Sequence, residues 1–345
     1  MNKLYGIMFQ DNITSNHLYN NILPQLQQYF KNDVNKEMEI VFDFTHVEYI
    51  SPTVIPNILN IGFILKNYFS SPVRLFIPWK PKLLSYLHDI NFLNLANRYD
   101  IFLMDSRYIG GYDFNKISPE YKTYMFLNDV DKAHIAYQIQ DSVKVIKEIC
   151  RSNDKMVADR SIEQILNIFI EICHNACYHS RKPCFATFQS NIGDKVKFKK
   201  AYISIADCGH GYNRSIIDKI KENEYNPLFL TKSTIEIGKK DENYLSILEA
   251  IFFRKQYENY GLFDVVKSVI YNNGTVRIHS NDTQLVITRS FYEKYLNDIE
   301  NNSEKIQLIK DIFKEGNSEG KYNVKHYTNR YKGVHIEIEV PIEII

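Results

Sequence analysis

A row of polar side chains on one predicted helix has the residue types and spacing of a metal–nucleotide site. Glu171, Asn175 and His179 follow one another at four-residue intervals, so in a helix they lie on successive turns of one face. The amide oxygen of Asn175 could ligate Mg²⁺, which takes oxygen ligands and keeps waters and phosphates in its shell. The carboxylate of Glu171 could act as a general base on an attacking water. The alternative is that this row is the solvated strip of an amphipathic helix.

The helix that must position this row is predicted from residue 161 to residue 178. Its apolar side chains recur every three or four residues, which is the period of one helix face. They are Ile162, Ile165, Leu166, Phe169, Cys173 and Ala176. Cys173 and Cys177 share this apolar face, so we expect two buried thiols rather than a zinc site formed with His174 and His179.

A second motif follows a short segment typical of a β-strand. Residues 202–206, Tyr-Ile-Ser-Ile-Ala, lead directly into Asp207, and Gly209 and Gly211 follow at intervals of two. A strand-end Asp can accept a hydrogen bond from the amino group of adenine, and glycines let the backbone bend tightly and approach the base. An Asp/Gly turn after a strand is also common without any ligand. The helix upstream is what makes the motif specific.

Together, these motifs resemble the N-box and first glycine box of the GHKL superfamily of ATP-binding domains, found in gyrase, heat-shock chaperones, histidine kinases and mismatch-repair ATPases. The resemblance spans about residues 158–345. It implies an α/β fold, a two-layer sandwich of the Bergerat type with a mixed sheet and helices on one face. It also implies binding of ATP and Mg²⁺, with Asn175 on the metal, Glu171 as the base of hydrolytic members, His179 near the phosphates and Asp207 on adenine.

A third motif is less complete. Residues 260–266, Tyr-Gly-Leu-Phe-Asp-Val-Val, resemble the second glycine box, in which a glycine-rich loop opens a helix whose free N–H groups meet the phosphates. This chain keeps Gly261, followed by Leu262, where the family has two or three glycines. A closed triphosphate lid normally uses several glycines, so we rank ATP binding above ATP chemistry.

The segment between Tyr212 and Tyr260 would form the ATP lid. Its basic residues include Lys219, Lys221, Lys232, Lys239, Lys240, Arg254 and Lys255. Arg254 and Lys255 come just before the third motif and are the best-placed cations for the phosphates. Solvated lysines on a helix surface are the more common explanation of such a set.

The last strand is predicted from a period of two. Aliphatic side chains alternate there with polar ones, in the order Val334, His335, Ile336, Glu337, Ile338, Glu339 and Val340. This pattern is typical of a half-buried strand, and it resembles the closing strand of the same superfamily.

The first part of the chain shows a different pattern, with strands alternating with helices in an α/β layer. The predicted strands are 39–44 and 73–77, and the predicted helices are 54–65 and 82–95. Residues 43–53 resemble the central signature of STAS domains, the fold of anti-sigma-factor antagonists. That resemblance places Thr53 at the phosphoacceptor position. The alternative is that Ser51 and Thr53 only cap the helix, which Pro52 opens.

We therefore predict a STAS-like α/β domain at 1–108, a linker and connecting helix at 109–157, and an ATP-binding domain at 158–345. The connecting helix could pack on the sheet or form a homodimer. Lys plus Arg number 42 and Asp plus Glu 41, so charge gives no evidence for nucleic-acid or membrane partners. No apolar run reaches the length of a membrane span, and five cysteines without a disulfide framework fit a cytoplasmic location.

Three functions remain open from the sequence. The first is a regulatory protein of the partner-switching type, in which Mg-ATP binding, with or without protein Ser/Thr kinase activity, controls its protein partners. The second is an ATPase whose lid closure drives dimerisation, with Glu171 as the base. The third is a nucleotide-sensing interaction module that does not hydrolyse ATP.

Overall fold

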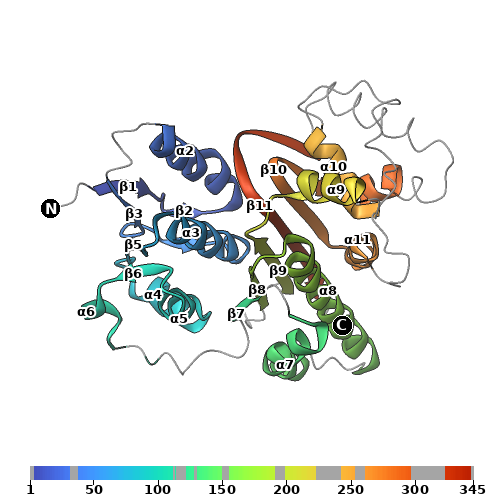
Figure 1. The fold of residues 1–345 in the computed structure, drawn as a ribbon. Coiled ribbons are helices and arrows are strands. Elements are labelled where there is room, and N and C mark those ends of the chain that lie inside the picture. The colour runs from blue at the N-terminus through green and yellow to red at the C-terminus, as the bar shows by residue number, and fades with distance from the viewer. Residues whose placement is uncertain are drawn as a thin grey trace.

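The computed structural model describes residues 4–31, 38–111, 113, 122–127, 130–149, 155–190, 199–222, 242–252, 261–296 and 323–342. This part of the chain is a mixed α/β protein with a four-stranded parallel sheet, a five-stranded antiparallel sheet and a short two-stranded parallel pair. The two larger sheets lie in separate halves of the molecule, with helices between and around them (Figure 1). None of the described helices is long and apolar enough to cross a membrane.

The N-terminal half is built on a four-stranded parallel sheet with the order β1-β3-β5-β6. Its strands are β1 (Leu4–Met8), β3 (Glu39–Asp43), β5 (Val73–Phe76) and β6 (Phe102–Met104). Strands β2 (Asn12–Ile13) and β4 (Tyr49–Ile50) form a separate short pair. The helical segments of this half are α1 (Ser15–His17), η1 (Leu18–Ile22), α2 (Leu23–Lys31), η3 (Pro52–Val54), α3 (Ile55–Phe69), α4 (Pro81–Asp89), α5 (Phe92–Arg98) and α6 (Ser106–Ile109).

Helix α3 lies between the two sheets and packs on β5 of one and on β8 and β9 of the other (Figure 1). Every residue from Ile55 to Gly62 is buried, which is typical of a helix that is apolar around its whole circumference. The helix ends where Ser70 adopts a left-handed conformation, with φ of 56°. The predicted helix 82–95 is two helices, because Asn91 between them has a φ of 69°.

The C-terminal half is built on a five-stranded sheet with the order β10-β11-β9-β8-β7. Its strands are β7 (Lys122–Phe126), β8 (Cys184–Ser190), β9 (Lys199–Asp207), β10 (Thr275–Ile287) and β11 (Val324–Ile342). Its helical segments are α7 (Lys132–Ile149), α8 (Lys155–Ser180), α9 (Tyr212–Lys221), α10 (Glu242–Phe252), α11 (Leu262–Tyr271), α12 (Arg289–Phe291) and η4 (Tyr292–Leu296). The segment expected to be a linker and helix, 109–157, thus also contributes the edge strand β7.

All pairings in this sheet are antiparallel, whereas the sequence resemblance implied a mixed sheet. A physical reason is visible at β7 and β8. Two helices, α7 and α8, join these strands and pack together, whereas a single crossover helix is the usual link between parallel neighbours. A pair of helices returns the chain to the end of the sheet that it left.

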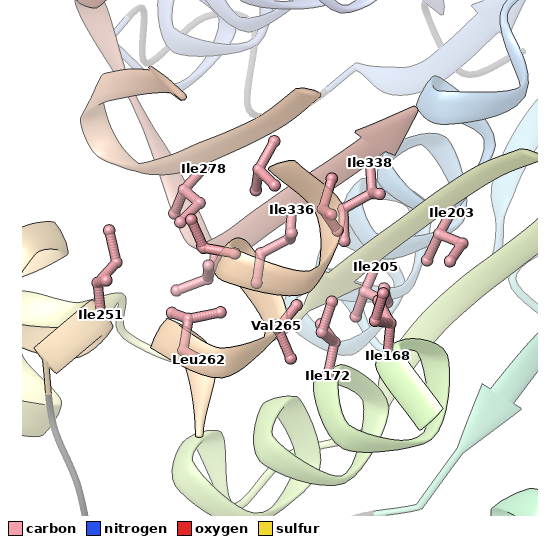
Figure 2. Close-up of a cluster of buried hydrophobic side chains, with 14 of the residues drawn as sticks. Ile168, Ile172, Ile203, Ile205, Ile251, Leu262, Val265, Ile278, Ile336 and Ile338 are labelled. Carbon is pink, nitrogen blue, oxygen red and sulfur yellow. The ribbon is translucent and has the colours of Figure 1, made fainter. Parts of the chain in front are cut away.

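One face of the five-stranded sheet is covered by α8, α10 and α11. Figure 2 shows the core beneath them, where isoleucines of β9 and β11 meet Ile168 and Ile172 of α8 and Leu262 and Val265 of α11. The other face is covered by η1, α2, η3 and α3 of the N-terminal half. The sheet is therefore buried on both sides.

The sequence predicts that strand β11 is half-buried, with its polar face exposed to solvent, but the structure buries that face as well. His335 and Glu337 are both buried, because they point toward the N-terminal half. His335 accepts a hydrogen bond from the amide of Asn57, 2.7 Å away, and its Nε2 donates to the carbonyl of Thr53 at 3.0 Å. Glu337 accepts a hydrogen bond from the hydroxyl of Ser15. The polar side chains that alternate with aliphatic ones along β11 therefore face a polar junction between the two halves of the molecule rather than solvent.

Candidate functional site

A pocket opens at the end of β9, on the face of the five-stranded sheet that α8, α10 and α11 cover. It is lined by the C-terminal turns of α8, the loop after β9, helix α9, the first turn of α11 and part of β11. The predicted site residues that line it are Asn175, His179, Asp207, Gly211, Gly261 and Leu262. Ile205, Leu262 and Ile336 give it apolar walls.

Asp207 stands where β9 leaves the sheet. One of its carboxylate oxygens accepts a hydrogen bond from the backbone N–H of Gly209 at 2.7 Å. Burial raises the pKa of this carboxyl to about 7, and the N–H groups of Gly209 and Val334 offset that rise only in part. Gly209 therefore supports the carboxylate, although it is not itself part of the pocket lining.

Gly211 turns the chain from β9 into α9. Its φ is +81°, a conformation that favours glycine. A Cβ at this position would lie 2.9 Å from the hydroxyl of Ser280. The same hydroxyl accepts a hydrogen bond from the N–H of Tyr212 at 3.0 Å, so it fixes the start of the helix.

Asn175 and Glu171 interact directly on α8. The amide nitrogen of Asn175 donates to a carboxylate oxygen of Glu171 at 3.1 Å. The other oxygen of Glu171 pairs with the ammonium of Lys132, 2.7 Å away. Glu171 lines a second hollow with Lys132 rather than the main pocket. Its geometry therefore suits orienting Asn175.

Asn175 can supply one of the few protein ligands that Mg²⁺ needs when phosphates and waters provide the others. Since its nitrogen bonds to Glu171, its amide oxygen is the atom that can ligate a metal in the pocket. The described residues contain no group of three or more His, Cys, Asp or Glu side chains arranged to hold a metal ion. Mg²⁺ needs no such cage when phosphates and waters complete its octahedron.

Lys219 of α9 is the cationic side chain that the structure adds to the site. Its ammonium lies 3.2 Å from Nδ1 of His179, and both line the pocket. In the sequence it was one basic residue of the predicted lid segment, and no local signal singled it out. Arg254 and Lys255 lie outside the described residues.

The first turn of α11 differs from a phosphate-binding loop. The backbone N–H of Gly261 is bound by the carboxylate of Asp264 at 2.9 Å, so one N–H expected to face phosphate already has an acceptor. The acidic side chain also occupies the positive end of the helix dipole. Gly261 and Leu262 line the pocket wall.

Thr53, the predicted phosphoacceptor position, is buried, with 5% of its surface exposed. Its hydroxyl lies 3.0 Å from that of Ser51, and its carbonyl accepts a hydrogen bond from Ser204 at 2.6 Å. Ser51 is the N-cap residue of η3 and Pro52 lies in its first turn, as the sequence predicts, but the Ser51 side chain makes no capping hydrogen bond. The helix start is therefore confirmed in position, without a side-chain cap from Ser51.

The expectation of buried thiols is confirmed for Cys173 and Cys177, which are both fully buried. Cys177 contacts the thiol of Cys184 at 3.3 Å, and burial raises the pKa of the Cys173 thiol. These thiols pack the C-terminal part of α8 against β8.

Comparisons with protein-family models, curated proteins and solved structures found no match for this chain.

Proposed function

We propose that this chain is an ATP-binding regulatory protein of the GHKL type, with Mg-ATP in the pocket at the end of β9. The observation that carries the proposal is that Asn175, Asp207, Gly211 and Gly261 line one pocket. They belong to three motifs that are separate in the sequence. Asn175 supplies an amide oxygen, Asp207 a buried carboxylate, and Gly211 a tight turn with a positive φ, while Gly261 lines the wall at the start of α11.

The pocket offers each part of the nucleotide a matching group. The carboxylate of Asp207 would accept a hydrogen bond from the adenine amino group, and Ile205 and Ile336 would pack on the ring. Asn175 would ligate Mg²⁺ together with the phosphates. Lys219, beside His179, would give the phosphates a cation from the described part of the chain.

The contacts of Glu171 favour nucleotide binding over hydrolysis. A general base needs a carboxylate oxygen that can reach the attacking water. In Glu171, one oxygen is bound by Lys132 and the other by Asn175, and neither lies on the main pocket. A regulatory protein or nucleotide sensor with little turnover follows from this geometry, and a dimerisation-gated ATPase requires Glu171 to move.

The proposed regulation concerns protein partners of the N-terminal, STAS-like half. The parallel sheet and alternating helices of this half support the likeness, and Thr53 is at the position of the phosphoacceptor. Because Thr53 is buried, we propose that ATP binding itself, rather than phosphorylation of this residue, is the signal. The partner protein would then bind the surface of the N-terminal half, while this half stays packed on the five-stranded sheet.

The test is calorimetric titration of Mg-ATP into the wild type and into Asn175→Ala and Asp207→Asn. Asn167→Ala is a matched control, since Asn167 is exposed on the same helix and lines the other hollow. We expect binding to the wild type and the control, and strongly reduced binding to both site variants. Equal binding to all four proteins, or none to the wild type, would refute the proposal.

Incubation of the complex with radiolabelled ATP separates the three functions. A switch or sensor without turnover predicts neither ADP nor a labelled protein. An ATPase predicts ADP whose formation is lost in Glu171→Gln, a variant expected to keep its Mg-ATP affinity, and a kinase predicts transfer of the γ-phosphate to Ser or Thr.

A further inference from the structure

One side chain of the N-terminal half reaches the back of the proposed adenine site. Asn60, on α3, is fully buried. Its amide nitrogen donates to the backbone carbonyl of Asp207 at 2.9 Å and to the hydroxyl of Tyr331 at 2.5 Å. Its amide oxygen accepts a hydrogen bond from the thiol of Cys208 at 2.6 Å. Both polar ends of the amide therefore engage residues at the end of β9 or beside it.

The backbone of Asp207 needs this support because β9 separates from β11 here. The last residues of β9 and β11 paired in register are Ala206 and His335. Beyond them, Gly333 has a φ of +102°, and a Cβ there would overlap the carbonyl of Asp207. A buried carbonyl without a partner costs about 1–3 kcal/mol. Asn60 supplies the donor from across the sheet.

We infer that Asn60 is a positioning residue for the carboxylate of Asp207, so that the N-terminal half helps to set the specificity of the pocket for adenine. The inference rests on the proposed function. Asn60 holds the main chain of Asp207 from one side of the sheet, and the carboxylate meets the ligand on the other. A shift of this peptide would move the acceptor away from the amino group of adenine.

Asn57 provides a matched control on the same helix. It lies three residues before Asn60 and is also fully buried. Its amide contacts the ring of His335 on β11, with nitrogen–nitrogen distances of 2.7 Å and 3.0 Å. Replacing either residue by Ala removes one buried amide from the junction, but only Asn60→Ala removes a donor to Asp207.

The experiment compares Mg-ATP with Mg-ITP, in which a carbonyl replaces the 6-amino group. Affinities of the full chain for both nucleotides are measured by calorimetry in the wild type, Asn60→Ala and Asn57→Ala, with thermal unfolding recorded for each. We expect the wild type to prefer ATP, and Asn60→Ala to lose that preference by about tenfold, which is about 1.4 kcal/mol. Asn57→Ala lowers the unfolding temperature but keeps the ATP/ITP ratio within about twofold.

A general loss of stability would not change the ratio of two affinities, so the ratio distinguishes positioning from packing. An unchanged ratio in Asn60→Ala, or an equal fall in both variants, would overturn the inference while leaving ATP binding intact. A wild type that binds neither nucleotide would overturn the proposed function, and the inference with it. Asn60→Leu, which keeps the branching of the side chain and its number of heavy atoms, gives the same readout if Asn60→Ala does not fold.

Discussion

Glu337 allows the polar junction between the two halves to be tested by pH. This carboxyl is buried beneath the N-terminal half, and burial raises its pKa to about 7 from an ordinary value of 4.5. The hydroxyl of Ser15 and the guanidinium of Arg277 offset the rise in part, but the nearest oxygen lies 3.9 Å from Arg277. His335 is 3.5 Å away, and burial lowers its pKa to about 3, so it contributes no charge.

The sign and size of the effect follow from proton linkage. Because the folded pKa is raised, the folded state keeps its proton in a range where the unfolded chain has lost it. The contribution of Glu337 to stability is therefore largest below about pH 4.5, falls as pH rises and levels off above about pH 7. A tenfold difference in proton affinity between the folded and unfolded states corresponds to about 1.4 kcal/mol. This carboxyl therefore lowers the free energy of unfolding at pH 8 by about 3 kcal/mol relative to pH 4.5.

Glu337→Gln places a neutral side chain of the same shape in the junction and removes this titration. We expect the variant to be more stable than the wild type by up to about 3 kcal/mol at pH 8 and to approach it near pH 4.5. Urea unfolding at a series of pH values measures the difference. Asp207 titrates in the same range, so the difference between variant and wild type, rather than either curve alone, isolates Glu337. Parallel curves for the two proteins would refute a buried, protonated Glu337.

Three further predictions concern the pocket. Lys219→Met should weaken Mg-ATP binding about tenfold by calorimetry and leave adenosine binding unchanged, whereas Lys221→Met, at the exposed end of the same helix, should do neither. Gly333→Ala should lower the unfolding temperature and abolish nucleotide binding, because its Cβ would overlap a neighbouring carbonyl at a φ of +102°; normal binding would contradict this. Glu171→Gln should keep Mg-ATP affinity, since its amide oxygen still orients Asn175, and Glu171→Ala should lower it in the same titration.

The parts of the site that the sequence predicts are those with local signals. Asn175 and His179 share a helix face because of their spacing, and both line the pocket. Asp207 and Gly211 follow from a strand end and a tight turn, and both line the same pocket. Lys219 is different, because its approach to His179 depends on how α9 packs beside α8. No local pattern distinguishes it from the other lysines of that segment.

The polar face of β11 shows what periodicity cannot resolve. A period of two separates the two faces of a strand, but it does not say what covers the polar face. The sequence predicts that His335 and Glu337 face solvent, yet their partners are Ser15, Thr53 and Asn57, between 278 and 322 residues earlier in the chain. Buried polar groups nearly always have hydrogen-bond partners. In the sequence, the asparagines within the apolar helix α3, Asn57 and Asn60, were the sign that this helix has buried polar partners.

This junction also limits how regulation can work. The first half of α3, from Ile55 to Gly62, is buried on all sides, so separating the two halves would expose an apolar helix face together with the sheet residues that it covers, at about 25 cal/mol per Å² of apolar surface. Release of the N-terminal half as a free partner is therefore unfavourable. In the function that we propose, a nucleotide signal would pass through the docked junction, where Asn60 donates a hydrogen bond to the carbonyl of Asp207. Partner binding at the outer surface of the N-terminal half can then be coupled to the pocket without dissociation, provided that it favours one position of α3.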